Sequence, residues 1–225
     1  MARDGYEADK TRLMTADFAD GKISNIRDLT TDFKYNAAGP IWTADSKSIY
    51  FNALAEGLQG IFRVNADGSI TRITKDNAWY DYDSPFAIVQ NGEETQLLAS
   101  WCSMDFPTEL VKVAVADGKS EQITHENEHI LSQLAEHKTE ARMVKTVDGK
   151  DMLTWVLYPP QFDSTKTYPG IVICLGGPQG TLSQSWSYRW NYRLMSAQGY
   201  VVALPNRRGT TAFGQEWCEQ ISGDY

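Results

Sequence analysis

The feature of this sequence that most constrains its fold is a short motif, Ala-Asp-Gly, that occurs three times at a nearly constant interval. The motif begins at Ala19, Ala66 and Ala116, a spacing of roughly 50 residues. The segments around the second copy, 60–65 and 69–74, alternate apolar with polar residues. An Asp-Gly turn between two alternating segments is typical of a β-hairpin. Hairpin units that recur at this period predict the blades of a β-propeller.

The repeat occupies residues 1–135, where it gives two full copies and part of a third. A closed propeller needs at least about four blades. We therefore expect residues 1–135 to be the C-terminal blades of an incomplete propeller whose earlier part precedes Met1. A propeller without a catalytic domain, acting as a binding protein, is one alternative, but its period would continue beyond residue 135.

From residue 136 onward the period is lost and strands alternate with a helical pattern. The expected elements are hairpin strands at 140–147 and 152–158, a buried strand at 170–175, a helix at 183–198 and a second buried strand at 200–204. Two apolar strands joined through a helix form a βαβ unit, which places the strands parallel in one sheet. Residues 136–225 are therefore expected to begin a doubly wound α/β domain.

The loop between the first buried strand and the helix is the strongest candidate for chemistry. It reads Leu175-Gly176-Gly177-Pro178-Gln179-Gly180. Glycines at the end of a strand leave backbone amides accessible, and an oxyanion hole needs such donors. In α/β-hydrolases a Gly-rich loop in this place borders the oxyanion hole.

A series of short motifs in the second half of the chain carries a specific resemblance. They are Asp148-Gly149, Tyr158-Pro159-Pro160, Tyr168-Pro169, Leu175-Gly176-Gly177-Pro178, Gly199-Tyr200, Asn206-Arg207-Arg208-Gly209, Phe213-Gly214 and Gly223-Asp224-Tyr225. Together they resemble the opening of the catalytic domain in the prolyl oligopeptidase family of serine peptidases. That family joins an α/β-hydrolase domain to a β-propeller, so the preceding repeats agree with it independently.

The resemblance implies incomplete β-propeller blades in residues 1–135, followed by the N-terminal part of an α/β-hydrolase peptidase domain in 136–225. Within the family, residues 186–191 and 206–209 most resemble a group of bacterial dipeptidyl peptidases. The function implied is hydrolysis of oligopeptides with release of N-terminal dipeptides. An acylaminoacyl or carboxylester hydrolase on the same scaffold is the alternative, because a fold does not determine a substrate.

The catalytic residues of the family are not expected within this chain. The family uses a Ser-Asp-His triad in that order, with the serine on a Gly-x-Ser-x-Gly elbow. No such elbow occurs in the sequence, so the triad is expected beyond Tyr225 and the chain alone is expected to be inactive. The three histidines precede the hydrolase strands and are expected to be ordinary linker or surface residues; they are His125, His129 and His137.

Several residues are candidates for supporting roles. The family often has Tyr or His where this chain has Leu175, which has no hydrogen-bond donor, so an amide of Gly176 or Gly177 or another side chain such as Tyr188 must serve. Arg208 matches an arginine of the family, and its planar fork suits a buried carboxylate near the active site. The pair Glu93-Glu94 is similar to the glutamates that hold a substrate amine in some dipeptidyl peptidases, but it follows Asn91-Gly92 and is expected in a solvated turn.

Composition excludes several other classes. The net charge of −8 and the scattered basic residues argue against a nucleic-acid or anionic-membrane partner. No apolar run approaches a membrane span, and the first five residues lack the apolar core of a signal peptide. Three cysteines cannot form a disulfide framework and are expected to be structural.

No metal or other cofactor is expected, and the expected partner is a peptide substrate. The resemblance allows a homodimer of the full-length protein. It favours the bacterial periplasm, with the cytoplasm as the alternative.

Overall fold

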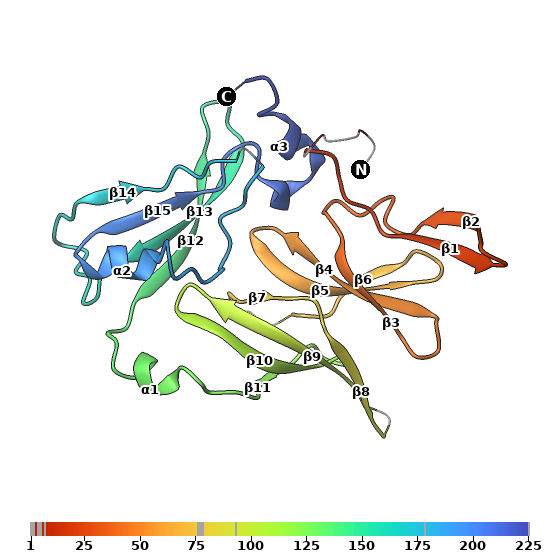
Figure 1. Ribbon diagram of the computed structural model, residues 1–225. Coiled ribbons are helices and arrows are strands. Elements are labelled where there is room, and N and C mark those ends of the chain that lie inside the picture. The colour runs from red at the N-terminus through yellow and green to blue at the C-terminus, as the bar shows by residue number, and fades with distance from the viewer. Residues whose placement is uncertain are drawn as a thin grey trace.

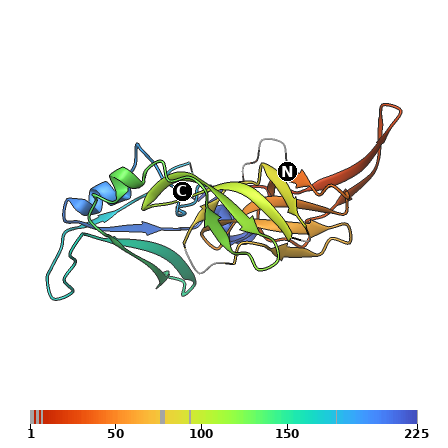
Figure 2. The same cartoon turned by 90° about the horizontal axis from the view of Figure 1, so that it is seen from below.

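The computed structural model describes residues 3, 6, 8–75, 79–92, 94–177 and 179–224. Most of this part of the chain forms β-sheet, and the helices are short. A projecting hairpin, two antiparallel sheets and one mixed sheet follow one another along the molecule (Figure 1). The view from below shows that this arrangement is elongated, with the hairpin at one end and the mixed sheet at the other (Figure 2). None of the sheets formed by the described residues closes on itself.

The first two Ala-Asp-Gly motifs form the predicted hairpin turns. The first turn joins β1 (Met14–Ala19) to β2 (Lys22–Asp28), which pair antiparallel. The first sheet consists of β3 (Ala38–Trp42), β4 (Ser48–Ala55), β5 (Leu58–Asn65) and β6 (Ile70–Arg72), in this order. The second turn joins β5 to β6, and Gly68 there has a φ of 85°, which a glycine adopts readily.

The third motif closes the corresponding hairpin of the second sheet. This sheet contains β7 (Asp81–Tyr82), β8 (Ala87–Asn91), β9 (Glu94–Ser103), β10 (Phe106–Ala114) and β11 (Ser120–Gln122). The turn joins β10 to β11. A Cβ added to Gly118 would lie 2.2 Å from the carbonyl oxygen of Ile73, so this turn packs directly against the chain that leaves the first sheet. The repeat therefore predicts both the turns and the side-by-side placement of the two sheets.

The short helix α1 (Glu128–Leu131) leads from the second sheet into the mixed sheet. The mixed sheet has the order β12-β13-β15-β14, with β12 (Lys138–Lys145), β13 (Asp151–Tyr158), β14 (Gly170–Val172) and β15 (Val201–Pro205). The hairpin β12–β13 is antiparallel, as predicted. Strands β14 and β15 pair parallel, which confirms the predicted parallel connection. After β15 come a 3₁₀ turn, η1 (Thr211–Phe213), and α3 (Gln215–Glu219).

Two expectations for this sheet are wrong in detail. The helix expected over residues 183–198 is only α2 (Tyr192–Ala197), because the side chain of Asn191 accepts a hydrogen bond from the Leu194 amide and starts the helix there. The first of the two strands expected to be buried, β14, is an edge strand within the described residues, and Val172 on it is 64% exposed. Its ladder nevertheless continues to Ile173, whose amide donates to the Ala203 carbonyl at 2.9 Å.

The hydrophobic core of the mixed sheet extends into the two antiparallel sheets. Buried Trp155, Leu157 and Leu204 pack with Met104, which comes from the turn between β9 and β10. The rings of Trp79 and Trp155 meet edge to face, with centroids 5.2 Å apart. The repeat-bearing sheets and the mixed sheet are thus packed against each other through apolar side chains, and the loops that follow β14 lie at this contact.

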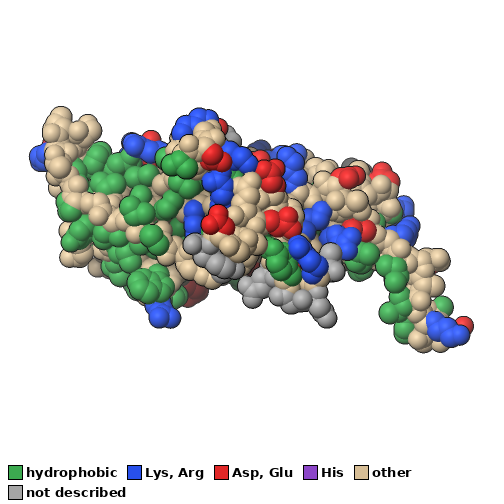
Figure 3. All heavy atoms as spheres, turned by 90° about the horizontal axis from the view of Figure 1, so that it is seen from above, with side chains coloured by type: hydrophobic (Ala, Val, Ile, Leu, Met, Phe, Trp, Pro, Cys, Tyr) green, Lys and Arg blue, Asp and Glu red, His purple; other side chains and the backbone are tan. Residues whose placement is uncertain are grey.

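Large apolar side chains are exposed at both ends of the molecule. The space-filling view shows hydrophobic atoms along the projecting hairpin and a larger group over the end with the mixed sheet (Figure 3). On the hairpin, Phe18 and Ile23 are cross-strand partners and are exposed by 75% and 67%. An exposed apolar ribbon with free backbone edges favours pairing with another chain.

We expect the double variant Phe18→Thr, Ile23→Thr to reduce concentration-dependent self-association. Threonine keeps the preference for strand structure and removes apolar area from both strands. Sedimentation velocity over a range of concentrations measures the effect, with Leu110→Thr on the second sheet as the control. Equal self-association of the double variant and the unaltered protein would show that the hairpin is not the associating surface.

Candidate active site

The loop after β14 leaves the mixed sheet at its exposed edge. Leu175 is half-buried, whereas Gly176 and Gly177 are exposed. Gly177 has a φ of 73°, in the left-handed region that favours glycine, and a Cβ at either glycine would meet open space. Among the described residues, no hydrogen bond uses the amide of Gly176 or Gly177. Both amides can therefore donate to a bound group, and the role of this loop at an oxyanion hole stays a prediction.

Arg207, which stands in a family motif but had no predicted role, holds the start of this loop. Its Nη2 donates to the carbonyl oxygen of Leu175 at 2.5 Å, and its Nη1 donates to the carbonyl of Arg208 at 2.6 Å. Gly180 packs closely on the other side, where an added Cβ would lie 2.7 Å from Leu175 Cδ2. The main chain at Leu175 is thus fixed by a guanidinium and by its own side chain.

Arg208 turns away from the loop. Its Nη2 donates to the carboxylate of Asp148 in the β12–β13 turn, and its Nε donates to Gln220 Oε1 at 2.5 Å. The guanidinium also lies over the ring of Trp217, 5.1 Å from its centroid. The carboxylate partner exists, but Asp148 is 47% exposed, so the predicted buried partner is wrong. Asp148 lies in a turn at the surface, where solvent reaches the ion pair.

A buried amide frame holds the next part of the loop. Asn206 Oδ1 accepts from the Leu182 amide and Asn206 Nδ2 donates to the Leu182 carbonyl, both at 2.9 Å. The same carbonyl accepts from Trp155 Nε1 at 3.0 Å. Asn206 itself is 1% exposed. The sequence contained Asn206 in a family motif but gave no sign of this backbone contact.

A buried carboxylate of the second sheet holds the loop from the opposite side. Asp81 on β7 accepts from the Gln59 amide at 2.9 Å and also from the Ser183 hydroxyl and the Gln184 amide. Asp81 is 7% exposed. Burial raises the pKa of its carboxyl from 3.8 to about 6, and the three hydrogen bonds lower the pKa only in part. The loop after β14 is therefore tied to both the mixed sheet and the second sheet.

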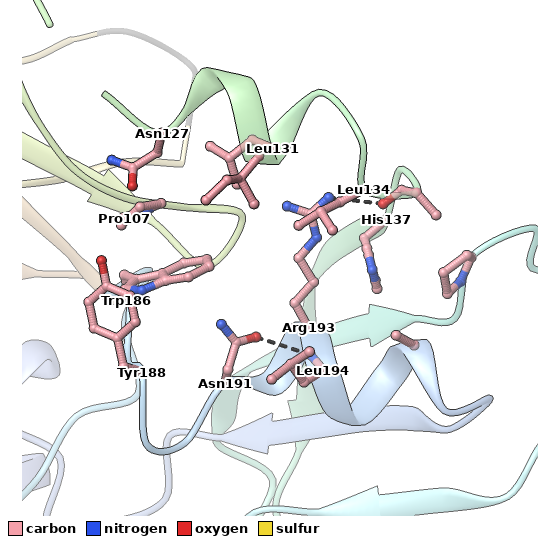
Figure 4. Close-up of a pocket in the computed structure, with 14 residues that line it drawn as sticks. Pro107, Asn127, Leu131, Leu134, His137, Trp186, Tyr188, Asn191, Arg193 and Leu194 are labelled. Atoms are coloured by element: carbon pink, nitrogen blue, oxygen red, sulfur yellow. Dashed lines mark hydrogen bonds between the residues drawn. The ribbon is translucent and has the colours of Figure 1, made fainter. Parts of the chain in front are cut away.

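Tyr188 lies away from this loop, in a separate apolar cavity of about 320 Å³ between α1, α2 and the second sheet (Figure 4). The tyrosine is 80% exposed and meets Trp186 edge to face, with centroids 5.8 Å apart. The cavity is not lined by residues 175–177. The structure does not bring the Tyr188 side chain to the glycines, so its predicted role as an oxyanion donor has no support in this geometry.

A serine and a histidine meet beside the same cavity. His137 Nδ1 and Ser196 Oγ are 2.7 Å apart, and Ser196 Oγ also donates to the Arg193 carbonyl. Ser196 has no exposed surface, so no substrate carbonyl can reach its hydroxyl. Burial and the charge of Arg193 lower the pKa of His137, which favours the neutral form of the ring. This pair fixes α2 and is not a nucleophile with its base.

The other candidate residues lie elsewhere. Glu94 is an exposed residue at the start of β9, as expected for a solvated turn, and Glu93 lies outside the described residues. Cys218 is buried, Cys102 is half-buried and Cys174 is exposed, and no two form a disulfide. No group of acidic, histidine and cysteine side chains in the described residues is arranged to hold a metal. No described helix is long and apolar enough to cross a membrane.

We expect Asn206→Ala to lower the free energy of unfolding by about 2–4 kcal/mol, because the substitution leaves the buried Leu182 amide unpaired and opens a small cavity. Urea unfolding measures the change. The control is Asn36→Ala, whose side chain accepts a surface hydrogen bond from Thr11, and its cost should stay under about 1.5 kcal/mol. Similar losses for both variants would contradict the role given to the buried frame.

We expect a pH dependence of stability that comes from Asp81. Its folded pKa of about 6 lies above the ordinary 3.8, so the folded protein binds this proton more tightly than the unfolded chain does. The resulting stabilisation is fully present below about pH 3.8 and is lost as the pH rises through about 6. At each pH, the free energy of unfolding of the Asp81→Asn variant is subtracted from that of the unaltered protein. This difference should fall by up to about 3 kcal/mol between pH 4 and pH 7.5. A constant difference, or a rise, would contradict the assignment.

Comparisons with known proteins agree on one family. The sequence pattern of the prolyl oligopeptidase family matches residues 186–225. Dipeptidyl-peptidase 5 of Porphyromonas gingivalis is 44% identical over 226 residues, which cover 100% of this chain and 32% of the relative. The corresponding enzyme of Porphyromonas endodontalis is also 44% identical and is covered to 31%. The chain thus spans about a third of the length of these curated relatives.

Solved structures show the same fold. The acylaminoacyl peptidase of Pyrococcus horikoshii superposes with a TM-score of 0.70 at 20% sequence identity, and the match covers 96% of this chain and 31% of that one. At this identity the likeness concerns the fold alone.

Proposed function

Because the chain belongs to the prolyl oligopeptidase family, we propose that it is part of a longer serine peptidase that releases dipeptides from the N-termini of oligopeptides. The observation that carries the chemistry is the loop at the end of β14, where the amides of two exposed glycines make no hydrogen bond among the described residues and Arg207 holds the main chain at Leu175. The relatives named dipeptidyl-peptidase 5 support the substrate class.

The proposal gives each part of the chain a role. The projecting hairpin and the two antiparallel sheets are β-propeller blades, which limit access to the site, and residues 136–225 begin an α/β-hydrolase domain. The order β12-β13-β15-β14 supports the second assignment, since a parallel pair follows an antiparallel hairpin in one sheet. Asp81 contacts Ser183 and Gln184, and Trp79 contacts Trp155, so both contacts join the two parts and support a site at their junction.

The reaction is acyl transfer to a serine. The serine hydroxyl, made nucleophilic by the histidine of the triad, attacks the scissile carbonyl, and negative charge develops on the carbonyl oxygen. Preorganised amides such as those of Gly176 and Gly177 stabilise that charge in the transition state. The sequence has no Gly-x-Ser-x-Gly elbow, and the relatives are about three times as long, so the triad belongs to another part of the longer protein.

An acylaminoacyl peptidase is the second candidate, supported by the likeness to the Pyrococcus horikoshii structure. The two activities differ in the group at the substrate N-terminus. A dipeptidyl peptidase needs a free ammonium group, whereas an acylaminoacyl peptidase accepts a blocked amine. Substrates that differ in this group alone therefore separate the two candidates.

We expect the longer protein to cleave a dipeptide-aminomethylcoumarin with a free N-terminus at least about tenfold faster, in kcat/KM, than its N-acetylated counterpart, because the ammonium contributes binding energy in the transition state. Fluorescence release measures both rates.

A fluorophosphonate probe should label the longer protein and leave residues 1–225 unlabelled, since the probe captures only an activated serine. Faster cleavage of the acetylated substrate would favour the second candidate, and labelling within residues 1–225 would contradict the assignment of the nucleophile.

A further inference from the structure

Arg207 reaches from the end of one strand to the end of its parallel neighbour. Strands β14 and β15 pair parallel, so their carboxyl ends meet at the same edge of the mixed sheet. Two residues after β15, the Arg207 guanidinium donates at 2.5 Å to the carbonyl of Leu175, three residues after β14. This is a charged donor on the first peptide group of the glycine loop.

We propose that Arg207 is a positioning residue, which sets the direction of the Gly176 amide through its hydrogen bond to the Leu175 carbonyl. This inference rests on the proposed function of the loop. The carbonyl of Leu175 and the amide of Gly176 belong to one planar peptide group, and in a trans peptide the two point in opposite directions. Fixing the oxygen on the Arg207 side therefore aims the N–H of Gly176 away from Arg207, toward the open side of the loop.

The charge of Arg207 adds an electronic effect to this geometry. A guanidinium bound to a carbonyl oxygen polarises the peptide group, which makes the N–H on the far side a stronger donor. A stronger and already oriented donor stabilises an oxyanion without reorganising when charge develops. The effect is therefore expected in the transition state and not in ground-state binding.

Arg207 is itself held rigidly enough to act in this way. Its backbone carbonyl accepts from Trp217 Nε1 at 2.9 Å and from Thr210 Oγ1 at 2.7 Å. Its Nη1 donates to the Arg208 carbonyl while Nη2 holds Leu175, so the planar fork is fixed at two points. A lysine keeps the charge but offers no rigid fork, so it should replace this function only in part.

The test uses the longer protein and compares Arg207→Ala, Arg207→Lys and Gly177→Val, with Arg142→Ala as the control. Arg142 lies on β12 and pairs with Glu140, away from the loop. Arg207→Ala should lower kcat about 10- to 100-fold, less than the 10²- to 10³-fold typical of losing a whole donor, and should leave KM within about twofold. Arg207→Lys should fall between Arg207→Ala and the unaltered protein.

Two further measurements separate positioning from a structural role. The affinity for a peptidyl trifluoromethyl ketone, which binds serine peptidases as an oxyanion, should weaken by about the same factor as kcat. Millimolar guanidinium chloride should restore part of the activity of Arg207→Ala and none in Gly177→Val. Should Arg207→Ala fail to fold, the intermediate kcat and inhibitor affinity of Arg207→Lys test the same point.

The outcomes distinguish this inference from the proposed function. If Gly177→Val lowers kcat while both Arg207 variants keep the kcat and inhibitor affinity of the Arg142→Ala control, Arg207 is not a positioning residue and the glycine loop stands. A loss of activity in Arg207→Ala that raises KM alone and leaves inhibitor affinity unchanged also overturns the inference. Unaltered kcat in Gly177→Val as well as in both Arg207 variants would overturn the proposed role of the loop together with that of Arg207.

Discussion

The arrangement of the candidate site depends on the backbone N–H and C=O of Leu182. Its amide and its carbonyl both bond to the side chain of Asn206, and the carbonyl also accepts from Trp155. A buried backbone group that lies outside a helix or sheet must find partners among side chains, because leaving it unpaired costs about 1–3 kcal/mol. One buried asparagine satisfies both backbone polar groups of this residue at once. The loop after β14 can therefore cross the core without forming secondary structure.

The second sheet constrains the same loop at some cost to stability. Asp81 is buried and its pKa is raised to about 6, so its charged form is disfavoured by desolvation near neutral pH. Its hydrogen bonds from Ser183 and Gln184 offset that penalty only in part. A buried carboxylate that costs stability is best understood as a means of fixing one geometry between two parts of the molecule. This interpretation places a constraint from the second sheet directly on the loop that we propose for catalysis.

The local elements could be predicted from the sequence to the extent that turn chemistry and periodicity determine them. Each Asp-Gly turn formed its hairpin, and the β12–β13 hairpin and the parallel pair followed from alternation and apolar runs. The length of α2 could not be predicted in this way. The pattern around Trp186 and Trp190 has helical spacing, but residues 183 and 184 form hydrogen bonds to Asp81. The edge position of β14 depends on strand order, which periodicity alone does not specify.

The neighbouring arginines show why the candidate site was only partly predictable. The sequence and the family resemblance both favoured Arg208, yet its guanidinium lies over Trp217 and bonds to Asp148, whereas that of Arg207 reaches Leu175. Both arginines follow the end of β15, and Arg208 already lies in the next turn, so the path of the chain sends their side chains in different directions. Which arginine faces the loop depends on the register of β15 against β14, a long-range pairing that no local pattern encodes. The residue that best accounts for the position of the glycine loop therefore becomes recognisable only when the strands on either side of it are in place.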